Sequence, residues 1–181
     1  MFLSVVHVPD VPIYTVHQHL WAYYPPKPPK AERPFLFRFF GERKALLLSA
    51  VKPLMPSVDL TDRIESGRVY AFDALLNPTE AKGGKKIGLF GNEARQDWLR
   101  RKLHGCDVRF VQVFDREPVH FIRGDGDKVT FAPARFTGAF QVTDKTLFLQ
   151  TMAHGVGRAK AWGCGLIYLP EVMDAVLNDH R

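Results

Sequence analysis

The sequence predicts an α+β protein made of two tandem ferredoxin-like (RRM-like) units, each with the element order βαββαβ. Short β-branched runs alternate with segments of helical periodicity along the whole chain. The length of 181 residues and a hydrophobic content of 46% suffice for two small cores. A stretch rich in lysine and glycine separates two halves of similar pattern. We therefore expect units at residues 1–77 and 89–181, joined by a basic linker at 78–88.

The first unit opens with an apolar, β-branched run at residues 1–8, which indicates a strand. A helix is expected over 12–24, because proline suits the first turn of a helix and apolar residues then recur at helical spacing. The proline-rich segment 25–30 must end this helix, since proline lacks an amide hydrogen, and is expected to form an exposed, extended connector.

Two apolar runs at residues 35–40 and 44–51 indicate a hairpin across the turn 41–43. Residues 57–66 contain a short helical candidate that begins at Ser57 or Asp59. A strand at 69–76 then completes the expected first unit.

In the second unit, a helix is expected at residues 92–104, where apolar residues recur at helical spacing. Strands are expected at 108–114 and 119–122, followed by a turn at 124–127 and a long strand region at 129–142, so that a hairpin should project there. A helix at 145–153 and a final strand at 164–169 follow. The count of strands is complete only if the weak apolar segment 87–90 supplies the first one.

A glycine-rich loop lies between the last predicted helix and the last predicted strand. It holds two close pairs of glycines around the basic residues Arg158 and Lys160, a composition that can offer amide hydrogens and positive charge to a polyanion. A turn that serves only packing is the alternative interpretation, and the spacing does not match the dinucleotide-binding fingerprint. The four glycines are Gly155, Gly157, Gly163 and Gly165.

A net charge of +6 favours an acidic partner, with nucleic acid as the leading candidate. The two cysteines are far apart, and neither an apolar leader nor a membrane-spanning run is evident, so we expect a cytoplasmic protein with no membrane association. The predicted helix at 92–104 carries basic residues that either bind phosphate or form a solvated face. These are Arg95, Arg100, Arg101 and Lys102.

Tyr14, His17 and Trp21 fall on one stripe of the first helix, beside its apolar face. A histidine there can transfer protons near neutral pH, as RNA cleavage by an internal 2′-hydroxyl requires, although a half-exposed packing histidine is the alternative. No cluster of histidine, cysteine or carboxylate has the spacing of a metal site. We expect no metal and no cofactor.

Several motifs together resemble the CasE family, the CRISPR repeat-RNA endoribonuclease subunit of the type I-E Cascade complex. They are YTVHQHLW (14–21), FLFR (35–38), EARQDWLRRKL (93–103) and GVGRAKAWGCGL (155–166), in the family's order. The resemblance implies metal-independent cleavage of precursor CRISPR RNA at the base of the repeat hairpin and retention of the product with other Cascade subunits. We expect the free protein to be a monomer.

The resemblance places the family's catalytic histidine at His17 and its partner tyrosine at Tyr14, and we hypothesise that Lys160 stabilises the developing charge. The expected RNA-binding residues are the four loop glycines, Arg158, the four basic residues of helix 92–104, and Arg38. Where relatives carry an arginine before Asn-Pro, this chain has Leu75 and Leu76, so a contact made there in relatives is not expected to be the same. A non-catalytic RNA-binding module and a purely structural subunit are the rival interpretations.

Overall fold

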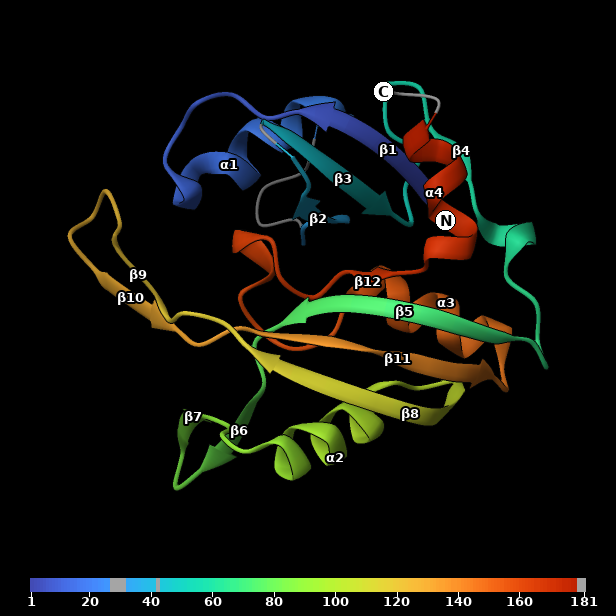
Figure 1. Cartoon of the computed structure of the whole chain (residues 1–181). Coiled ribbons are helices and arrows are strands. Elements are labelled where there is room, and N and C mark those ends of the chain that lie inside the picture. The colour runs from blue at the N-terminus through green and yellow to red at the C-terminus, as the bar shows by residue number, and fades with distance from the viewer. Residues whose placement is uncertain (27–31, 42, 179–181) are drawn as a thin grey trace.

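The computed structural model describes residues 1–26, 32–41 and 43–178. Two four-stranded antiparallel sheets lie one above the other, each associated with its own helices (Figure 1). This arrangement confirms the predicted α+β class with two tandem ferredoxin-like units. Most of the proline-rich connector expected at 25–30 lies outside the described residues.

The first sheet has the strand order β2-β3-β1-β4. α1 (Ile13–Leu20), continued by the 3-10 turn η1 (Trp21–Tyr23), connects β1 to β2. α1 starts directly after Pro12, which has no amide hydrogen to leave unpaired at the helix start. The strands are β1 (Phe2–His7), β2 (Phe35–Phe39), β3 (Lys44–Ser49) and β4 (Val58–Asp59).

Both faces of the first sheet are buried, which explains the continuous apolar run in β3. Ala45 and Leu47 face α1 and pack with Val16 and Leu20. Leu46 and Leu48 point to the other face and join a larger core that continues into the second sheet. One apolar cluster thus runs through both units.

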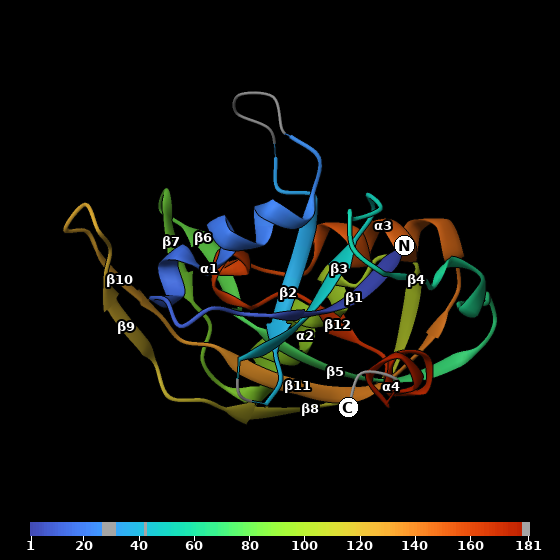
Figure 2. The same ribbon diagram turned by 90° about the horizontal axis from the view of Figure 1, so that it is seen from above.

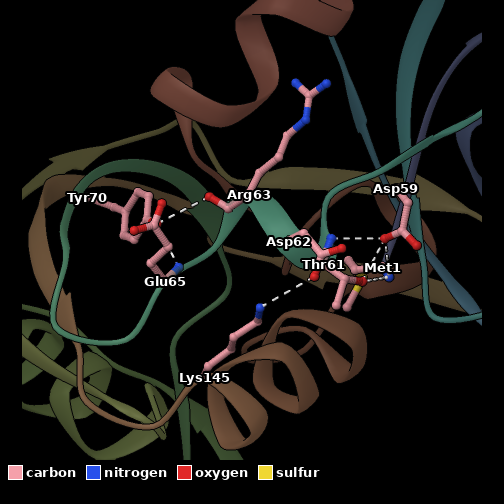
Figure 3. A network of polar contacts seen from close by, with 8 residues as sticks. All are labelled: Met1, Asp59, Thr61, Asp62, Arg63, Glu65, Tyr70 and Lys145. Carbon is pink, nitrogen blue, oxygen red and sulfur yellow. Dashed lines mark hydrogen bonds and ion pairs between the residues drawn. The ribbon is translucent and has the colours of Figure 1, made fainter.

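A polar network replaces the helix expected at 57–66 (Figure 3). The hydroxyl and amide of Thr61 donate to Asp59 Oδ1 at 2.6 and 2.9 Å, and these bonds lower the pKa of Asp59 to about 2. The amino terminus of Met1 donates to Thr61 Oγ1 at 2.7 Å. Because the Asp59 side chain bonds its local backbone in a turn, the segment forms β4 and one 3-10 turn, η2 (Thr61–Arg63), rather than a helix.

The second sheet has the strand order β12-β5-β11-β8, and the order β5-α2-β8-β11-α3-β12 along the chain is a complete βαββαβ unit. The strand at 69–76, expected to close the first unit, is instead β5 of this second sheet, where it pairs with β11 and β12. The sheets therefore divide between β4 and β5, and the boundary expected at residue 77 falls inside the second unit. The elements are β5 (Val69–Leu76), α2 (Asn92–Lys102), β8 (Cys106–Asp115), β11 (Ala134–Val142), α3 (Lys145–His154) and β12 (Ile167–Tyr168).

Two hairpins extend from this sheet. The linker expected at 78–88 forms the first, β6 (Thr79–Lys82) with β7 (Lys85–Gly88), and the indole of Trp98 on α2 donates to the Thr79 carbonyl at 3.1 Å. The second, β9 (Val119–Ile122) with β10 (Lys128–Phe131), rises toward α1 (Figures 1 and 2). The long strand region expected at 129–142 is therefore two strands, interrupted before β11 at Pro133, which cannot donate to a ladder.

The last strand is shorter than expected, and the sequence analysis missed the helix that follows it. Within 164–169 only β12 pairs, because the chain before it turns at Gly163 and Gly165. Pro170 then starts α4 (Pro170–Asn178), which buries Val172, Met173 and Val176 against the common core. This helix contacts β1 and β5 and so binds the two sheets together.

Candidate catalytic pocket and nucleic-acid interface

Tyr14 and His17 line one pocket of about 520 Å³. α1 positions them, because its buried residues Val16 and Leu20 fix which side of the helix faces the first sheet. Tyr14 and His17, three residues apart, then share the stripe beside that face. Both side chains are half-buried, so they border the pocket without being sealed in the core.

The opposite walls of this pocket come from distant parts of the chain. Ala161 and Trp162 belong to the 3-10 turn η3 (Lys160–Trp162) of the glycine-rich loop. Arg123, with Gly124 and Asp125, comes from the tip of the β9–β10 hairpin. The predicted first helix, glycine loop and projecting hairpin therefore meet at one site.

A chain of aromatic contacts holds these three elements together. The Tyr14 and Phe121 rings stack with centroids 6.0 Å apart, and Phe121 meets Trp162 edge to face at 5.3 Å. Trp162 also stacks on Phe131 at 5.3 Å. Such contacts restrict the rings, so Phe121 and Trp162 help to fix Tyr14 relative to the glycine loop.

The glycine-rich loop is packed tightly and not open. Gly155 (φ 72°) and Gly157 (φ 80°) adopt conformations that favour glycine, and an added Cβ would lie 2.6 Å from Leu36 Cδ1 and 3.0 Å from Trp98 respectively. The amides of Gly155, Val156 and Gly165 donate to protein carbonyls at 2.9 Å. These amides do not supply the free donors that the sequence suggested, and the loop offers its side-chain cations instead.

Those cations line a second, basic cleft of about 590 Å³ between α2, α3 and the loop. Lys102 comes from α2 and Lys86 from the β6–β7 hairpin. Arg158 and Lys160 come from the loop, and burial followed by the nearby charge of Arg33 lowers the pKa of Lys160. The imidazoles of His104 and His154 border the same cleft.

Lys160 borders this basic cleft, whereas its chain neighbours Ala161 and Trp162 border the pocket of Tyr14 and His17. The structure thus places the third expected catalytic residue at the junction of the two hollows. Gly163 and Gly165, the remaining glycines of the loop, are buried.

The expected basic residues of α2 divide into a buried one and three exposed ones. Arg95 is only 5% exposed, donates from Nε to the Leu89 carbonyl at 2.8 Å, and pairs with Asp115. Its guanidinium is therefore used within the fold. The exposed ones are Arg100, which pairs with Asp97 at 3.0 Å, Arg101, which pairs with Glu80, and Lys102.

Arg38 lies apart from both hollows, at the junction of the two sheets. Its Nη2 contacts Asp73 Oδ1 at 2.6 Å, and Arg135 Nε donates to the other carboxylate oxygen at 2.6 Å. Since Arg38 is on β2 and Asp73 is on β5, this ion pair connects the sheets. The contact gives Arg38 a structural role.

Sequence reasoning missed Lys86 and Arg123. The sequence contains a usable signal for each. Lys86 belongs to the lysine-rich stretch expected to be a linker, and Arg123 directly precedes the predicted turn at 124–127. Among the described residues, no group of three or more histidine, cysteine or carboxylate side chains is placed to hold a metal ion. In the same part of the chain, no helix has the length and hydrophobicity needed to cross a membrane.

Comparison with known proteins identifies the family. A curated relative, the CRISPR system Cascade subunit CasE of Escherichia coli (strain K12), is 29% identical over 183 residues, covering 87% of this chain and 91% of the relative. The crystal structure of Cas6e from the same organism superposes with a TM-score of 0.74 at 24% identity, covering 93% of this chain and 98% of that one. Thermus thermophilus Cse3 bound to an RNA representing a pre-cleavage complex gives a TM-score of 0.72 at 20% identity, over 93% and 98% of the two chains. These likenesses support the tandem ferredoxin-like fold. A family model described as CRISPR associated protein matches residues 10–170, and the chain therefore belongs to this family and is a CasE family member.

Proposed function

We propose that the protein is a metal-independent endoribonuclease that cleaves precursor CRISPR RNA at the base of the repeat hairpin. The observation that carries the proposal is the shared pocket of Tyr14 and His17, walled by the glycine loop and flanked by a basic cleft. A group that transfers protons thus lies beside a surface suited to a phosphate backbone. The names of the relatives, a Cascade subunit and RNA-bound Cse3, agree with this substrate class.

In the proposed reaction, the 2′-oxygen next to the scissile phosphate attacks phosphorus while the bond from phosphorus to the 5′-oxygen breaks. The 2′-hydroxyl loses its proton and the departing 5′-oxygen gains one, so the products are a 2′,3′-cyclic phosphate and a 5′-hydroxyl. No water is consumed. His17 serves as the general base or the general acid, and a single histidine performs one of these two roles in a given turnover.

Tyr14 has a positioning role in this scheme. Its ring is fixed by Phe121, and its hydroxyl can orient the 2′-hydroxyl or a phosphate oxygen through a hydrogen bond. Lys160, at the junction of the two hollows, adds positive charge near the phosphate as negative charge develops.

The basic cleft holds the RNA stem by its backbone. Duplex RNA is recognised mainly through shape and phosphate contacts, for which exposed cations on rigid elements are suited. We assign this role to Lys86, Lys102 and Arg158, which line the cleft, and to Arg100 and Arg101, which are exposed on the same helix as Lys102. Arg95 is left out because its guanidinium is buried. Retention of the cleaved hairpin and association with other Cascade subunits complete the proposal.

His17→Ala tests the proposal, with His19→Ala as the matched control. His19 is on the same helix, is exposed and does not border the pocket. His17→Ala should lower the single-turnover cleavage rate of a repeat hairpin by roughly a hundredfold or more and leave hairpin affinity nearly unchanged. His19→Ala should cleave like the parent protein. Cleavage by His17→Ala within a few-fold of the parent rate would make His17 a packing residue, and binding without cleavage by the parent would favour a non-catalytic RNA-binding subunit.

A further inference from the structure

The tip of the β9–β10 hairpin is a defined loop that carries an arginine into the catalytic pocket. The Arg123 amide donates to the Asp127 carbonyl at 2.9 Å, and the Gly126 amide donates to the Arg123 carbonyl at 2.9 Å. Gly126 has a φ of 88°, which lets the chain reverse within five residues. Arg123 is therefore at a fixed point of the hairpin, directly where the strands end.

The hairpin is anchored on the catalytic helix itself. Phe121, two residues before Arg123, stacks on Tyr14 and meets Trp162 edge to face. At Gly124 an added Cβ would lie 3.9 Å from Tyr14 Cε2, so the backbone of the tip also passes close to this ring. These contacts place Arg123 on the wall of the pocket that faces Tyr14 and His17.

Arg123 is the only lysine or arginine among the described residues that border this pocket. Lys160 borders the adjacent basic cleft and not this pocket. Asp125 also borders the pocket, and its carboxylate would repel an RNA phosphate unless a cation balanced it. A phosphate that enters this pocket next to His17 therefore has one guanidinium in the pocket wall to balance its charge.

The present partners of this guanidinium leave it available for a phosphate. Arg123 contacts Asp125 at 3.0 Å and Asp127 at 3.8 Å, and its side chain is 47% exposed. Ion pairs at this exposure contribute little, because water screens both charges. A guanidinium forms stronger, bidentate hydrogen bonds with a phosphate that is partly removed from water.

We propose that Arg123 is a further catalytic residue, which binds the non-bridging oxygens of the scissile phosphate and stabilises the charge that they gain during attack. This inference rests on the proposed function, since it requires that the phosphate beside His17 is the one that is cleaved. Arg123 donates hydrogen bonds and transfers no proton. Proton transfer from the 2′-hydroxyl or to the 5′-oxygen is the role of His17, as in the proposed reaction.

The first test compares Arg123→Gln with Arg109→Gln. Arg109 on β8 is a suitable control, because it is also half-exposed and paired with a neighbouring aspartate, Asp107, at 3.2 Å, but borders neither hollow. At saturating RNA, Arg123→Gln should lower the single-turnover rate by about a hundredfold, the scale for one donor to a developing oxyanion, and Arg109→Gln should not. Affinity for a hairpin made uncleavable by one 2′-deoxyribose should change by only a few-fold in both variants. Arg123→Lys keeps the charge without the paired donors and should recover part of the rate.

A second test asks whether Arg123 touches the scissile phosphate itself. One non-bridging oxygen is replaced by sulfur, and each of the two diastereomers is assayed with the parent protein and Arg123→Gln. If the guanidinium binds that oxygen, the rate loss caused by sulfur in one diastereomer should be clearly smaller in Arg123→Gln than in the parent. Identical sulfur effects in both proteins would overturn the inference, even if Arg123→Gln were slow through displacement of the hairpin.

The outcomes separate this inference from the proposed function. If Arg123→Gln cleaves as fast as Arg109→Gln while His17→Ala is inactive, the assignment of Arg123 is wrong and the proposed function stands. If Arg123→Gln weakens binding but keeps the rate at saturation, Arg123 holds the RNA elsewhere and the assignment is also wrong. If His17→Ala cleaves like the parent, the proposed role of His17 is wrong. The catalytic assignment of Arg123, which requires the scissile phosphate to lie beside His17, is then also without support.

Discussion

Gly155 is expected to be the most sensitive position of the glycine-rich loop, and Gly155→Ala is a direct test of how the loop is built. Its backbone has φ 72° and ψ 163°, a region that is essentially reserved for glycine. An added Cβ would also lie 2.6 Å from Leu36 Cδ1 and 2.9 Å from the Gly165 carbonyl oxygen. Leu36 is buried, so its methyl groups cannot move away without disturbing the common core.

The expected cost follows from two separate effects. The backbone conformation costs about 1–3 kcal/mol for any residue with a Cβ. Overpacking against Leu36 and the Gly165 carbonyl costs about 1–3 kcal/mol more. Gly155→Ala should therefore lower the free energy of unfolding by about 2–6 kcal/mol, a large part of the stability of an ordinary domain.

Gly67→Ala is the matched control, because Gly67 also has a positive φ, 84°, but an added Cβ would meet nothing within 4 Å. It should lose only roughly 1–2 kcal/mol from backbone strain. Urea unfolding followed by circular dichroism and tryptophan fluorescence measures both variants. Equal losses in the two variants would refute the packing argument, because the contacts with Leu36 and the Gly165 carbonyl would then have no energetic consequence.

Two further predictions concern RNA binding. The double variant Arg100→Glu/Arg101→Glu should weaken hairpin binding, most of all at low salt. The single-turnover rate at saturation should be unchanged, because phosphate contacts position the RNA without breaking it. Equal affinity of the variant and the parent protein across a salt titration would show that these two arginines of α2 do not contact the RNA. Burial and the charge of Arg33 lower the pKa of Lys160, so part of the free protein carries a neutral Lys160 at alkaline pH below the ordinary lysine value. A bound phosphate favours the ammonium form and raises this pKa again, so RNA binding in that window should take up protons, as calorimetry in two buffers of different ionisation enthalpy would show. Lys160→Gln should remove this uptake, and an uptake that persists in this variant would contradict the assignment.

The sequence was most informative where a local pattern decides a local structure. The spacing of Tyr14 and His17 on a helix placed both side chains beside the apolar face, and the structure brings them to one pocket. The turn predicted at 124–127 is likewise confirmed by the backbone hydrogen bonds across it. Glycine and aspartate, which make up this turn, favour a tight chain reversal. These features depend on only a few neighbouring residues each.

Features that depend on distant partners were predicted less well. A strand such as β5 looks the same whether it pairs with the first sheet or the second, so its position in the second sheet could not be read from its own residues. Arg95 was grouped with the basic surface, although it is three residues before the buried Trp98 and therefore on the same helix face. Its burial follows from that spacing once the partner Asp115 on β8 is known.

The α4 helix was missed despite a usable signal. Pro170 is suited to a first helical turn, and Val172, Met173 and Val176 follow at helical spacing. The two hollows, in contrast, have walls from three separate parts of the chain, and no local pattern contains that information.

Attack by the 2′-hydroxyl is tested by replacing one ribose, immediately 5′ of the scissile phosphate, by deoxyribose in an otherwise natural repeat hairpin. The change removes the proposed nucleophile and almost none of the shape or charge that the protein binds. We expect the deoxy hairpin to bind within a few-fold of the natural RNA and to remain uncleaved. The natural RNA should yield a 2′,3′-cyclic phosphate at a rate that excess EDTA leaves unchanged. Cleavage of the deoxy hairpin, or cleavage of the natural RNA that EDTA abolishes and magnesium restores, would mean attack by a metal-activated water and would contradict the role assigned to His17.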